Sequence, residues 1–269
     1  MLYIIYRDYP VSNYILEGLI KNSNVTLVKI PVLQISLYMR MIYWIERFFA
    51  INICPTVRFS HDNISVFHRI KKDDNILLWD FMQYVDIKYI IKTVSSSQNY
   101  LWIWNTITKS QGKEIRYYRK NGIKLCTFDP QDAKQYNLTL LNQVFRNMHK
   151  NNAIECYDFF FIGKDKGRSH FLEQLAQTLI QGGYRIKFLL LADKDTFYSP
   201  NGHLEFLSQS ISYLTVLGLI AQSRVIVDIT KSDQTGITLR VLEAAFAGKK
   251  LLTNNKNVKH LDFYNNKNI

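Results

Sequence analysis

The chain contains few of the residues that hold small disulfide-bonded or metal-bound proteins together. Its 269 residues include only three cysteines, and these never form a Cys-x-x-Cys pair: Cys54, Cys126 and Cys156. An odd number of scattered cysteines argues against both a disulfide framework and a zinc site. Such cysteine usage fits a reducing compartment best, so we expect a cytoplasmic protein.

Long apolar runs are also missing. No stretch approaches the roughly 18 uninterrupted apolar residues of a membrane-spanning helix, and the apolar run at residues 1–6 is too short for a signal peptide. The nearest candidate is the segment 31–59, which polar residues interrupt, among them Gln34, Arg40, Glu46 and Arg47. Its simpler interpretation is an ordinary buried helix with a loop. The alternative is a helix that lies on an anionic membrane surface, with Arg40 and Arg47 toward the headgroups.

The charge is strongly positive. Lys and Arg number 34 against 22 Asp and Glu, which gives a formal net charge of +12. This excess suits three kinds of partner, namely nucleic acid, anionic lipid or a phosphorylated small molecule. Richness in Ile, Lys, Asn, Tyr and Phe is also what AT-rich coding produces, so we discount part of the basicity.

Short apolar runs alternate with amphipathic stretches of helix length, a pattern typical of βα units around a parallel sheet. In the first half, strands are expected at 2–6, 25–30, 64–67, 76–79, 100–104 and 123–128, and helices at 12–20, 83–94 and 111–120. In the second half, strands are expected at 157–162, 184–191, 225–229 and 250–253, and helices at 169–181, 212–222 and 237–247. The polar stretch 130–154 between them is patterned weakly enough to hold a domain boundary. The prediction is an α/β fold of two Rossmann-like domains, 1–150 and 151–269, facing a cleft.

Parallel sheets bind ligands at the carboxyl ends of their strands, where helix N-termini attract anions. The first candidate loop is 163–168, between a predicted strand and a helix that Ser169 is expected to cap. It contains two glycines and three cations, and a phosphate group would fit it: Gly163, Gly167, Lys164, Lys166 and Arg168. It matches neither a P-loop nor a Rossmann fingerprint, and a solvated basic turn is the alternative.

A second candidate loop, 230–236, precedes the predicted helix 237–247. That helix is apolar on nearly every side, which indicates burial. Its single carboxylate, Glu243, therefore needs a partner, since an unpaired buried charge is costly. From the residues alone, the partner is either Arg240 or a ligand hydroxyl.

Three segments together resemble the donor-binding half of GT-B glycosyltransferases, and most of all the bacterial enzymes of capsule, O-antigen and lipopolysaccharide core assembly. The segments are 157–168 (YDFFFIGKDKGR), 223–229 (SRVIVDI) and 235–253 (TGITLRVLEAAFAGKKLLT). The resemblance covers residues 157–269, whereas the first half matches only in architecture. It implies an acceptor-side N-terminal domain and a nucleotide-sugar-binding C-terminal domain.

The resemblance also implies roles for particular residues. The diphosphate of a nucleotide sugar would contact Gly163, Lys166, Arg168, Gly236 and Thr238. Glu243 would hold the nucleotide ribose, with Arg240 beside it in the donor site. Many retaining members carry a second glutamate eight residues earlier, where this chain has Thr235, so the stereochemistry stays open.

A catalytic base, if the enzyme inverts, is expected from the first half. The favoured candidates are Asp80 and Asp8, followed by Asp129, His61 and His68. A strand-end aspartate is more often a helix cap than a base. No Asp-x-Asp motif is assigned to a metal-bound diphosphate, so we expect no metal and no cofactor, with Lys, Arg and helix dipoles neutralising the leaving group.

The resemblance thus implies a hexosyltransferase-like enzyme of bacterial surface polysaccharide synthesis. It would move a sugar from a nucleotide-sugar onto a lipid-linked or lipopolysaccharide acceptor. The aromatic and basic segment 38–49 is a candidate contact with the acceptor or with an anionic inner-membrane surface, and no nucleic acid partner is expected. The alternative function is a non-catalytic basic protein that binds anionic lipid or nucleic acid. Another nucleotide-dependent enzyme on the same fold is less favoured.

Overall fold

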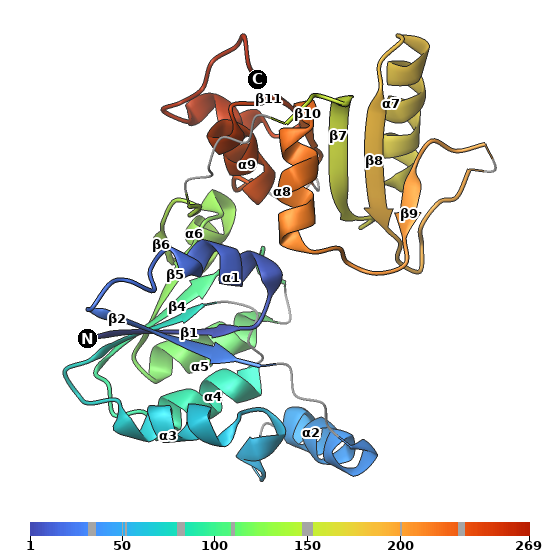
Figure 1. The fold of residues 1–269 in the computed structure, drawn as a ribbon. Coiled ribbons are helices and arrows are strands. Elements are labelled where there is room, and N and C mark those ends of the chain that lie inside the picture. Colours follow the sequence, from blue (N-terminus) through green and yellow to red (C-terminus); the bar gives the residue numbers. More distant parts are fainter. Residues whose placement is uncertain are drawn as a thin grey trace. The chain divides into compact units, whose positions relative to one another are not determined.

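The computed structural model divides the chain into two compact units, Met1–Asn142 and Gln143–Ile269, each built on its own parallel sheet (Figure 1). It describes residues 1–31, 36–49, 51, 53–79, 84–108, 111–146, 153–199, 201–230 and 235–269. The predicted boundary at 150 and 151 falls outside these residues. The two parallel sheets with covering helices agree with the predicted α/β class.

The first unit holds a six-stranded sheet in the order β2-β1-β3-β4-β5-β6. Its strands are β1 (Leu2–Arg7), β2 (Val25–Ile30), β3 (Asn75–Trp79), β4 (Gln98–Ile103), β5 (Ile123–Thr127) and β6 (Thr139–Leu140). Its helices are α1 (Pro10–Glu17), α2 (Leu37–Phe49), the 3-10 turn η1 (Pro55–Val57), α3 (His61–Arg69), α4 (Tyr84–Thr93), α5 (Gly112–Lys120) and α6 (Pro130–Tyr136). The strand order reverses between β1 and β3, as in doubly wound folds.

One face of this sheet forms the main core of the first unit. Alternate strand residues such as Ile5, Leu78 and Leu101 point to the same face because side chains in a strand alternate. They pack against Phe67 of α3 and Ile90 of α4, both fully buried. The near-continuous apolar strands seen in the sequence follow from this burial.

Two predictions for the first unit were wrong. Residues 64–67, expected as a strand, belong to α3, which a capping box starts: Asn63 N donates to Ser60 Oγ (3.2 Å) and Ser60 N to Asn63 Oδ1 (3.3 Å). The weakly patterned stretch 130–154 contains α6 and β6, and the division between the two units lies within it, as expected. Asp129 starts α6 by accepting from the backbone N–H groups of Gln131 and Asp132.

The second wrong prediction is the segment 31–59, for which a buried helix was the favoured interpretation. Its described part forms α2, but most of the large apolar side chains of α2 are exposed. Glu46, a charged residue, is instead fully buried and pairs with Arg58. Helix α2 therefore exposes apolar side chains and buries a charged one, which is the reverse of an ordinary core helix.

The second unit holds a five-stranded sheet in the order β11-β10-β7-β8-β9. Its strands are β7 (Tyr157–Lys164), β8 (Ile186–Leu191), β9 (Glu205–Leu207), β10 (Ser223–Asp228) and β11 (Lys250–Thr253). Its helices are α7 (Ser169–Gln181), α8 (Tyr213–Ala221), α9 (Leu239–Ala247) and the 3-10 turn η3 (Lys256–His260). The chain order reverses between β7 and β10, so a crevice is expected outside their carboxyl ends.

In this unit α7 packs on β8, while α8 and α9 pack on β10 (Figure 1). Phe161, Leu190 and Val227 from three adjacent strands meet Leu172 and Ala176 of α7 in one cluster. The sequence predicted every strand here except β9, a short edge strand. No helix in the described part of the chain is long and apolar enough to cross a bilayer.

Candidate functional site

The connection from β7 to α7 is a tight basic turn. β7 runs through Gly163 and Lys164, so only residues 165–168 remain outside regular structure. Lys166 (φ 51°) and Gly167 (φ 77°) adopt consecutive left-handed conformations, which Gly167 accepts without strain. The backbone N–H of Lys166 donates to Asp193 Oδ2 at 2.9 Å, so this backbone position is fixed by the loop after β8.

Ser169 was predicted to cap the N-terminus of α7, but the structure has Asp165 in that role. The fully buried carboxylate of Asp165 accepts from the N–H groups of Arg168 (2.7 Å) and Ser169 (2.6 Å), and from Ser169 Oγ at 3.0 Å. Burial alone would raise the pKa of Asp165, but hydrogen bonds from Thr196, Ser169 and Arg168 hold it below its usual value. The protein's own carboxylate therefore occupies the anion-attracting start of α7.

Arg168 joins the carboxyl ends of β7 and β10. Its guanidinium donates to the carbonyl oxygens of Lys164 (2.5 Å), Asp165 (3.0 Å) and Ile229. It also lies over the ring of Phe161, 5.3 Å from the centroid. Burial lowers the pKa of Arg168, and the carboxylates nearby oppose that shift.

Gly163 provides the room that Arg168 needs. A Cβ atom on Gly163 would lie 3.1 Å from Arg168 Nη2, closer than most side-chain contacts. Gly163 and Arg168, both predicted to contact a diphosphate, thus contact each other in the structure. Both residues were expected in one loop, but Gly163 was expected to make room for a ligand and not for Arg168.

The second candidate loop is held by side chains from the start of η3. Asn255 Nδ2 donates to Gly236 O (3.0 Å), and Asn257 Nδ2 donates to Thr235 O (2.8 Å). Thr238 Oγ1 donates to Asp228 Oδ1 at 2.9 Å. Residues 231–234 of the predicted loop lie outside the described residues. Residues 235–238 are fixed directly before α9, which begins at Leu239, two residues later than predicted.

Asp228, the last residue of β10, is buried at the centre of these contacts. It accepts from Thr238 on one oxygen and from Thr253 Oγ1 on the other, at 3.0 Å. Burial raises the pKa of Asp228, while the hydroxyl groups, Arg240 and Arg168 oppose the shift. Asp228 was not among the predicted site residues, although its position at the end of a strand, before the second loop, could have indicated a role in the site.

Glu243 on α9 has both of its carboxylate oxygens occupied. Tyr213 Oη donates to Oε1 at 2.5 Å, and Arg240 Nη1 binds Oε2. The Glu243 side chain is wholly buried, whereas the Arg240 side chain keeps 22% exposure. Burial raises the pKa of Glu243, against the opposing effects of Arg240 and Tyr213. The structure thus supplies the predicted arginine partner and adds Tyr213, from the start of α8.

The candidate bases of the first unit lie in different settings. Asp8 directly follows β1, is partly exposed, and accepts from Asn13 Nδ2 at 2.6 Å. Asp129 is the buried cap of α6, and His61 and His68 lie exposed on α3. Asp80 lies outside the described residues. Asp129 therefore has the structural role that is commonest for a strand-end aspartate, whereas Asp8 keeps a partly exposed carboxylate that pairs with Lys29 at 3.7 Å.

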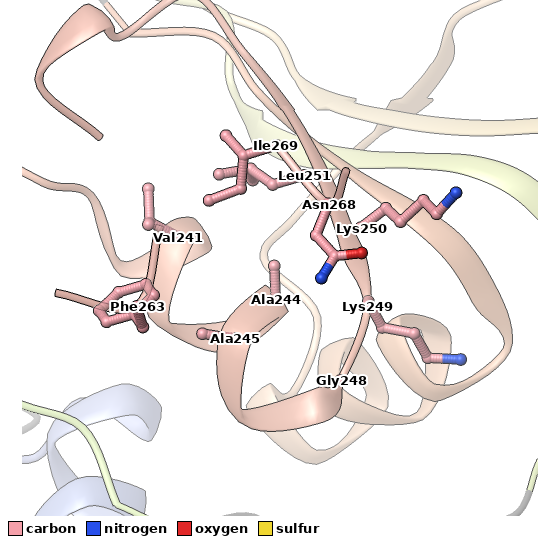
Figure 2. A pocket seen from close by; sticks show the side chains of 10 residues that line it. All are labelled: Val241, Ala244, Ala245, Gly248, Lys249, Lys250, Leu251, Phe263, Asn268 and Ile269. Carbon is pink, nitrogen blue, oxygen red and sulfur yellow. The ribbon is translucent and has the colours of Figure 1, made fainter. Parts of the chain in front are cut away.

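A surface pocket of about 320 Å³ lies beside α9 and β11 (Figure 2). Its apolar lining comes from both elements and from the last residues of the chain, with Leu251 and Ile269 adjacent to each other. The seven predicted donor-binding residues do not line it. This pocket therefore stands apart from the two loops described above.

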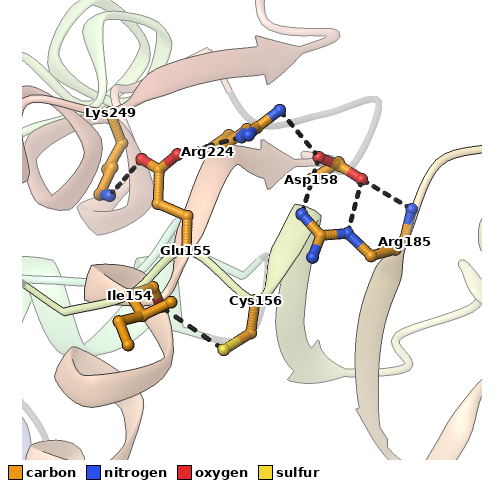
Figure 3. Close-up of polar contacts among 7 residues, drawn as sticks. All are labelled: Ile154, Glu155, Cys156, Asp158, Arg185, Arg224 and Lys249. Atoms are coloured by element: carbon orange, nitrogen blue, oxygen red, sulfur yellow. Dashed lines mark hydrogen bonds and ion pairs between the residues drawn. The ribbon is translucent and has the colours of Figure 1, made fainter.

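The amino ends of the same sheet carry a cluster of paired charges (Figure 3). Arg224 Nε lies 3.0 Å from Glu155 Oε2 and Arg224 Nη1 lies 3.3 Å from Asp158 Oδ1. Lys249 pairs with Glu155 at 3.2 Å and Arg185 with Asp158 at 3.3 Å. Hydrogen bonds from Lys249 and Arg224 keep the pKa of Glu155 low. Basic residues at this edge are therefore matched by carboxylates.

Among the described residues, no group of three or more His, Cys, Asp or Glu side chains is arranged to hold a metal ion. At the carboxyl edge of the second sheet, acidic and basic side chains instead lie together. The carboxylates Asp165, Asp228 and Glu243 lie with the guanidinium groups of Arg168 and Arg240, and their charges influence one another. The arrangement fits the binding of a polar ligand that carries both hydroxyl and anionic groups.

No protein-family model and no curated protein sequence matches this chain. Solved structures do match it in fold. An alpha-glucosyltransferase in complex with UDP and a 13-mer DNA superposes with a TM-score of 0.56 at 10% identity, covering 94% of this chain and 79% of that one. An alpha,alpha-trehalose-phosphate synthase (UDP-forming) from Burkholderia vietnamiensis gives 0.52 at 9% identity, with 94% and 84% covered. The predicted α/β fold with parallel sheets is therefore confirmed, and this chain shares it with both of these solved structures.

Proposed function

We propose that this chain is a glycosyltransferase that binds a nucleotide-sugar donor at the carboxyl ends of β7 and β10. One observation carries the proposal: Arg168, from the loop after β7, donates to the carbonyl of Ile229, directly after β10. The two loops at the topological switch point are thereby tied together. This is the position at which open parallel sheets bind nucleotides.

The diphosphate is assigned to the start of α9 rather than to the start of α7. Asp165 already accepts the first N–H groups of α7, whereas α9 has no side-chain cap because the Thr238 hydroxyl bonds to Asp228. An uncapped helix start attracts anions. In this proposal Gly236 and Thr238 present the backbone of α9 to the diphosphate, and the exposed Lys166 faces it from the other loop.

Arg240 is proposed as the side chain that touches the donor, with Glu243 holding it in place. Glu243 is wholly buried, but Arg240 on its carboxylate remains partly exposed. A guanidinium held in this way can bind phosphate or ribose oxygens. The ribose contact that the resemblance assigns to Glu243 is thus made through Arg240.

The chemical step is assigned to a carboxylate of the first unit. Asp8 and Asp80 are proposed as bases that deprotonate an acceptor hydroxyl, and positive side chains with the α9 dipole would stabilise the departing diphosphate. No cofactor is proposed, and transfer is expected to persist in the presence of EDTA. In Asp8→Asn and Asp80→Asn variants, turnover should fall while nucleotide binding stays unchanged.

The acceptor is proposed to be a lipid-linked or lipopolysaccharide glycan at the anionic inner face of a bacterial membrane. The formal charge of +12 and the exposed apolar side chains of α2 support this choice. DNA is the second candidate acceptor, because a structure of similar fold holds a DNA oligomer and the chain is basic. Radiolabelled sugar transfer to lipid-linked glycan and to duplex DNA distinguishes the two.

The donor site is tested by thermal-shift titration with UDP, GDP, ADP, CMP and dTDP at two salt concentrations. One nucleotide should stabilise the protein saturably, since ligands that bind only the folded state raise its stability. Lys166→Ala and Arg240→Ala should weaken that effect. Lys250→Ala is the matched control, because Lys250 is exposed at the amino end of β11. Salt-sensitive binding to liposomes or nucleic acid without any nucleotide effect would instead support the non-catalytic alternative.

A further inference from the structure

Helix α2 presents a continuous apolar face to solvent. Leu37, Met41, Trp44 and Phe48 are spaced four, three and four residues apart, so they share one side of the helix. Their exposed fractions are 79%, 58%, 62% and 68%. Several further apolar side chains beside or just beyond this face are also exposed: Tyr38, Phe49, Ile51 and Ile53. Contiguous exposed apolar surface of this kind marks an interaction site.

The opposite side of α2 is fixed by buried charge. Glu46 is fully buried, binds the guanidinium of Arg58, and accepts from the N–H groups of Ile53 and Cys54 at 2.6 Å each. Arg58 Nε in turn lies 3.1 Å from Asp86 Oδ1. Because this chain of contacts runs into the core, the helix cannot turn its apolar face inward without burying unpaired charges.

The charge of the outer surface favours one occupant. Glu46 is the only acidic residue within α2, and its carboxylate is buried, whereas Arg40 is exposed. The solvent side of the helix therefore combines aromatic and aliphatic side chains with positive charge, which complements anionic lipid headgroups. A second copy of the chain fits less well, since α2 has no exposed carboxylate to pair with the Arg40 side chain of another copy.

We propose that α2 inserts its apolar face into the headgroup region of an anionic membrane, with the helix axis parallel to the surface. Its 13 residues make a helix about 20 Å long, which suits lying in the interface. The Glu46–Arg58 pair fixes which face meets the lipid. The inference rests on the proposed function only in that a lipid-linked acceptor would be met at the same surface.

The fluorescence of Trp44 provides a direct test. The other three tryptophans, Trp79, Trp102 and Trp104, are buried, so a blue shift on adding vesicles reports on Trp44. We expect this shift, and co-flotation, with phosphatidylcholine vesicles that contain phosphatidylglycerol, and much less with phosphatidylcholine alone. Met41→Ser/Phe48→Ser keeps the reporter and should weaken binding at least about tenfold, since two large apolar side chains are lost.

The matched control is Phe171→Ser/Leu214→Ser, which removes two exposed apolar side chains from the second unit and should bind vesicles like the wild type. Equal vesicle binding by wild type and the Met41/Phe48 variant overturns the inference, as does self-association through α2 without vesicle binding. The nucleotide titration tests the donor site independently of vesicle binding. Nucleotide stabilisation without vesicle binding overturns this inference alone, and vesicle binding without nucleotide stabilisation overturns only the donor site.

Discussion

The hydroxyl of Tyr213 donates a 2.5 Å hydrogen bond to Oε1 of Glu243, thirty residues further along the chain. This bond connects the first residue of α8 to the buried carboxylate of α9, whose other oxygen binds Arg240. The charge of Glu243 is therefore satisfied before any ligand arrives. Its proposed role in donor binding follows from how it positions Arg240.

Removing the Tyr213 hydroxyl should destabilise the second unit. In Tyr213→Phe, Oε1 of the buried carboxylate loses this donor, and we expect the free energy of unfolding to fall by about 1–3 kcal/mol. Chemical denaturation measures the change. Tyr198→Phe is the control, because Tyr198 is largely exposed and should change stability little. Equal effects of the two substitutions would contradict the importance of this bond.

Stability should depend on pH through Glu243. Its pKa is raised on folding by burial, so the folded state binds this proton more tightly than the unfolded state. The contribution of Glu243 to the free energy of unfolding therefore falls as pH rises from its unfolded pKa, about 4.3, through its folded pKa. The Glu243→Gln variant lacks this titration. Its stability relative to the wild type should rise across that interval, and parallel stability curves would show the expectation to be wrong.

Arg168→Lys should be costly even though it keeps the charge. An ammonium group cannot reproduce the fork that reaches the carbonyls of Lys164, Asp165 and Ile229. We expect a loss of about 1–3 kcal/mol in unfolding free energy together with weaker nucleotide binding. Arg224→Lys serves as the control, because its ion pairs are exposed to solvent and such pairs contribute little to stability. A loss no larger than that of the control would contradict the bridging role.

Breaking the buried ion pair of the first unit should release α2. Arg58→Met leaves Glu46 buried without its guanidinium partner, at an expected cost of about 3–5 kcal/mol. Arg58→Met combined with Glu46→Leu removes both charges and should recover part of that loss. Denaturation curves give the energies, and limited proteolysis within residues 36–49 reports on α2. A double variant that is no more stable than Arg58→Met would argue against this pair as the cause.

The sequence predicted the second unit well because its signals are local. The run Lys250–Thr253 is short, contains two adjacent leucines and follows the helix-ending Gly248 closely, and it forms β11 with those bounds. Glu243 was expected to need a partner because its helix is apolar all round, and Arg240, three residues earlier, supplied one. Tyr213 was missed because the fold, rather than the spacing along the chain, brings α8 beside α9.

The first unit was predicted less well where polarity and period conflicted. Residues 64–67 alternate in a way that favours a strand, but Ser60 and Asn63 form a capping box that starts α3. In α2, hydrophobicity predicted burial, whereas Glu46 and Arg58 meet inside. Two residues twelve positions apart in sequence decide the orientation of that helix, and a hydrophobic pattern carries no information about such a pairing.

The contact between Gly163 and Arg168 also affects how variation at these positions should be interpreted. A methyl group at Gly163 would displace the guanidinium of Arg168. This would also disturb its hydrogen bonds to the carbonyls at the ends of β7 and β10. Once Arg168 is replaced by a shorter side chain, the same methyl group meets less resistance. The effects of changes at the two positions should therefore be non-additive, and the two residues should evolve as a pair.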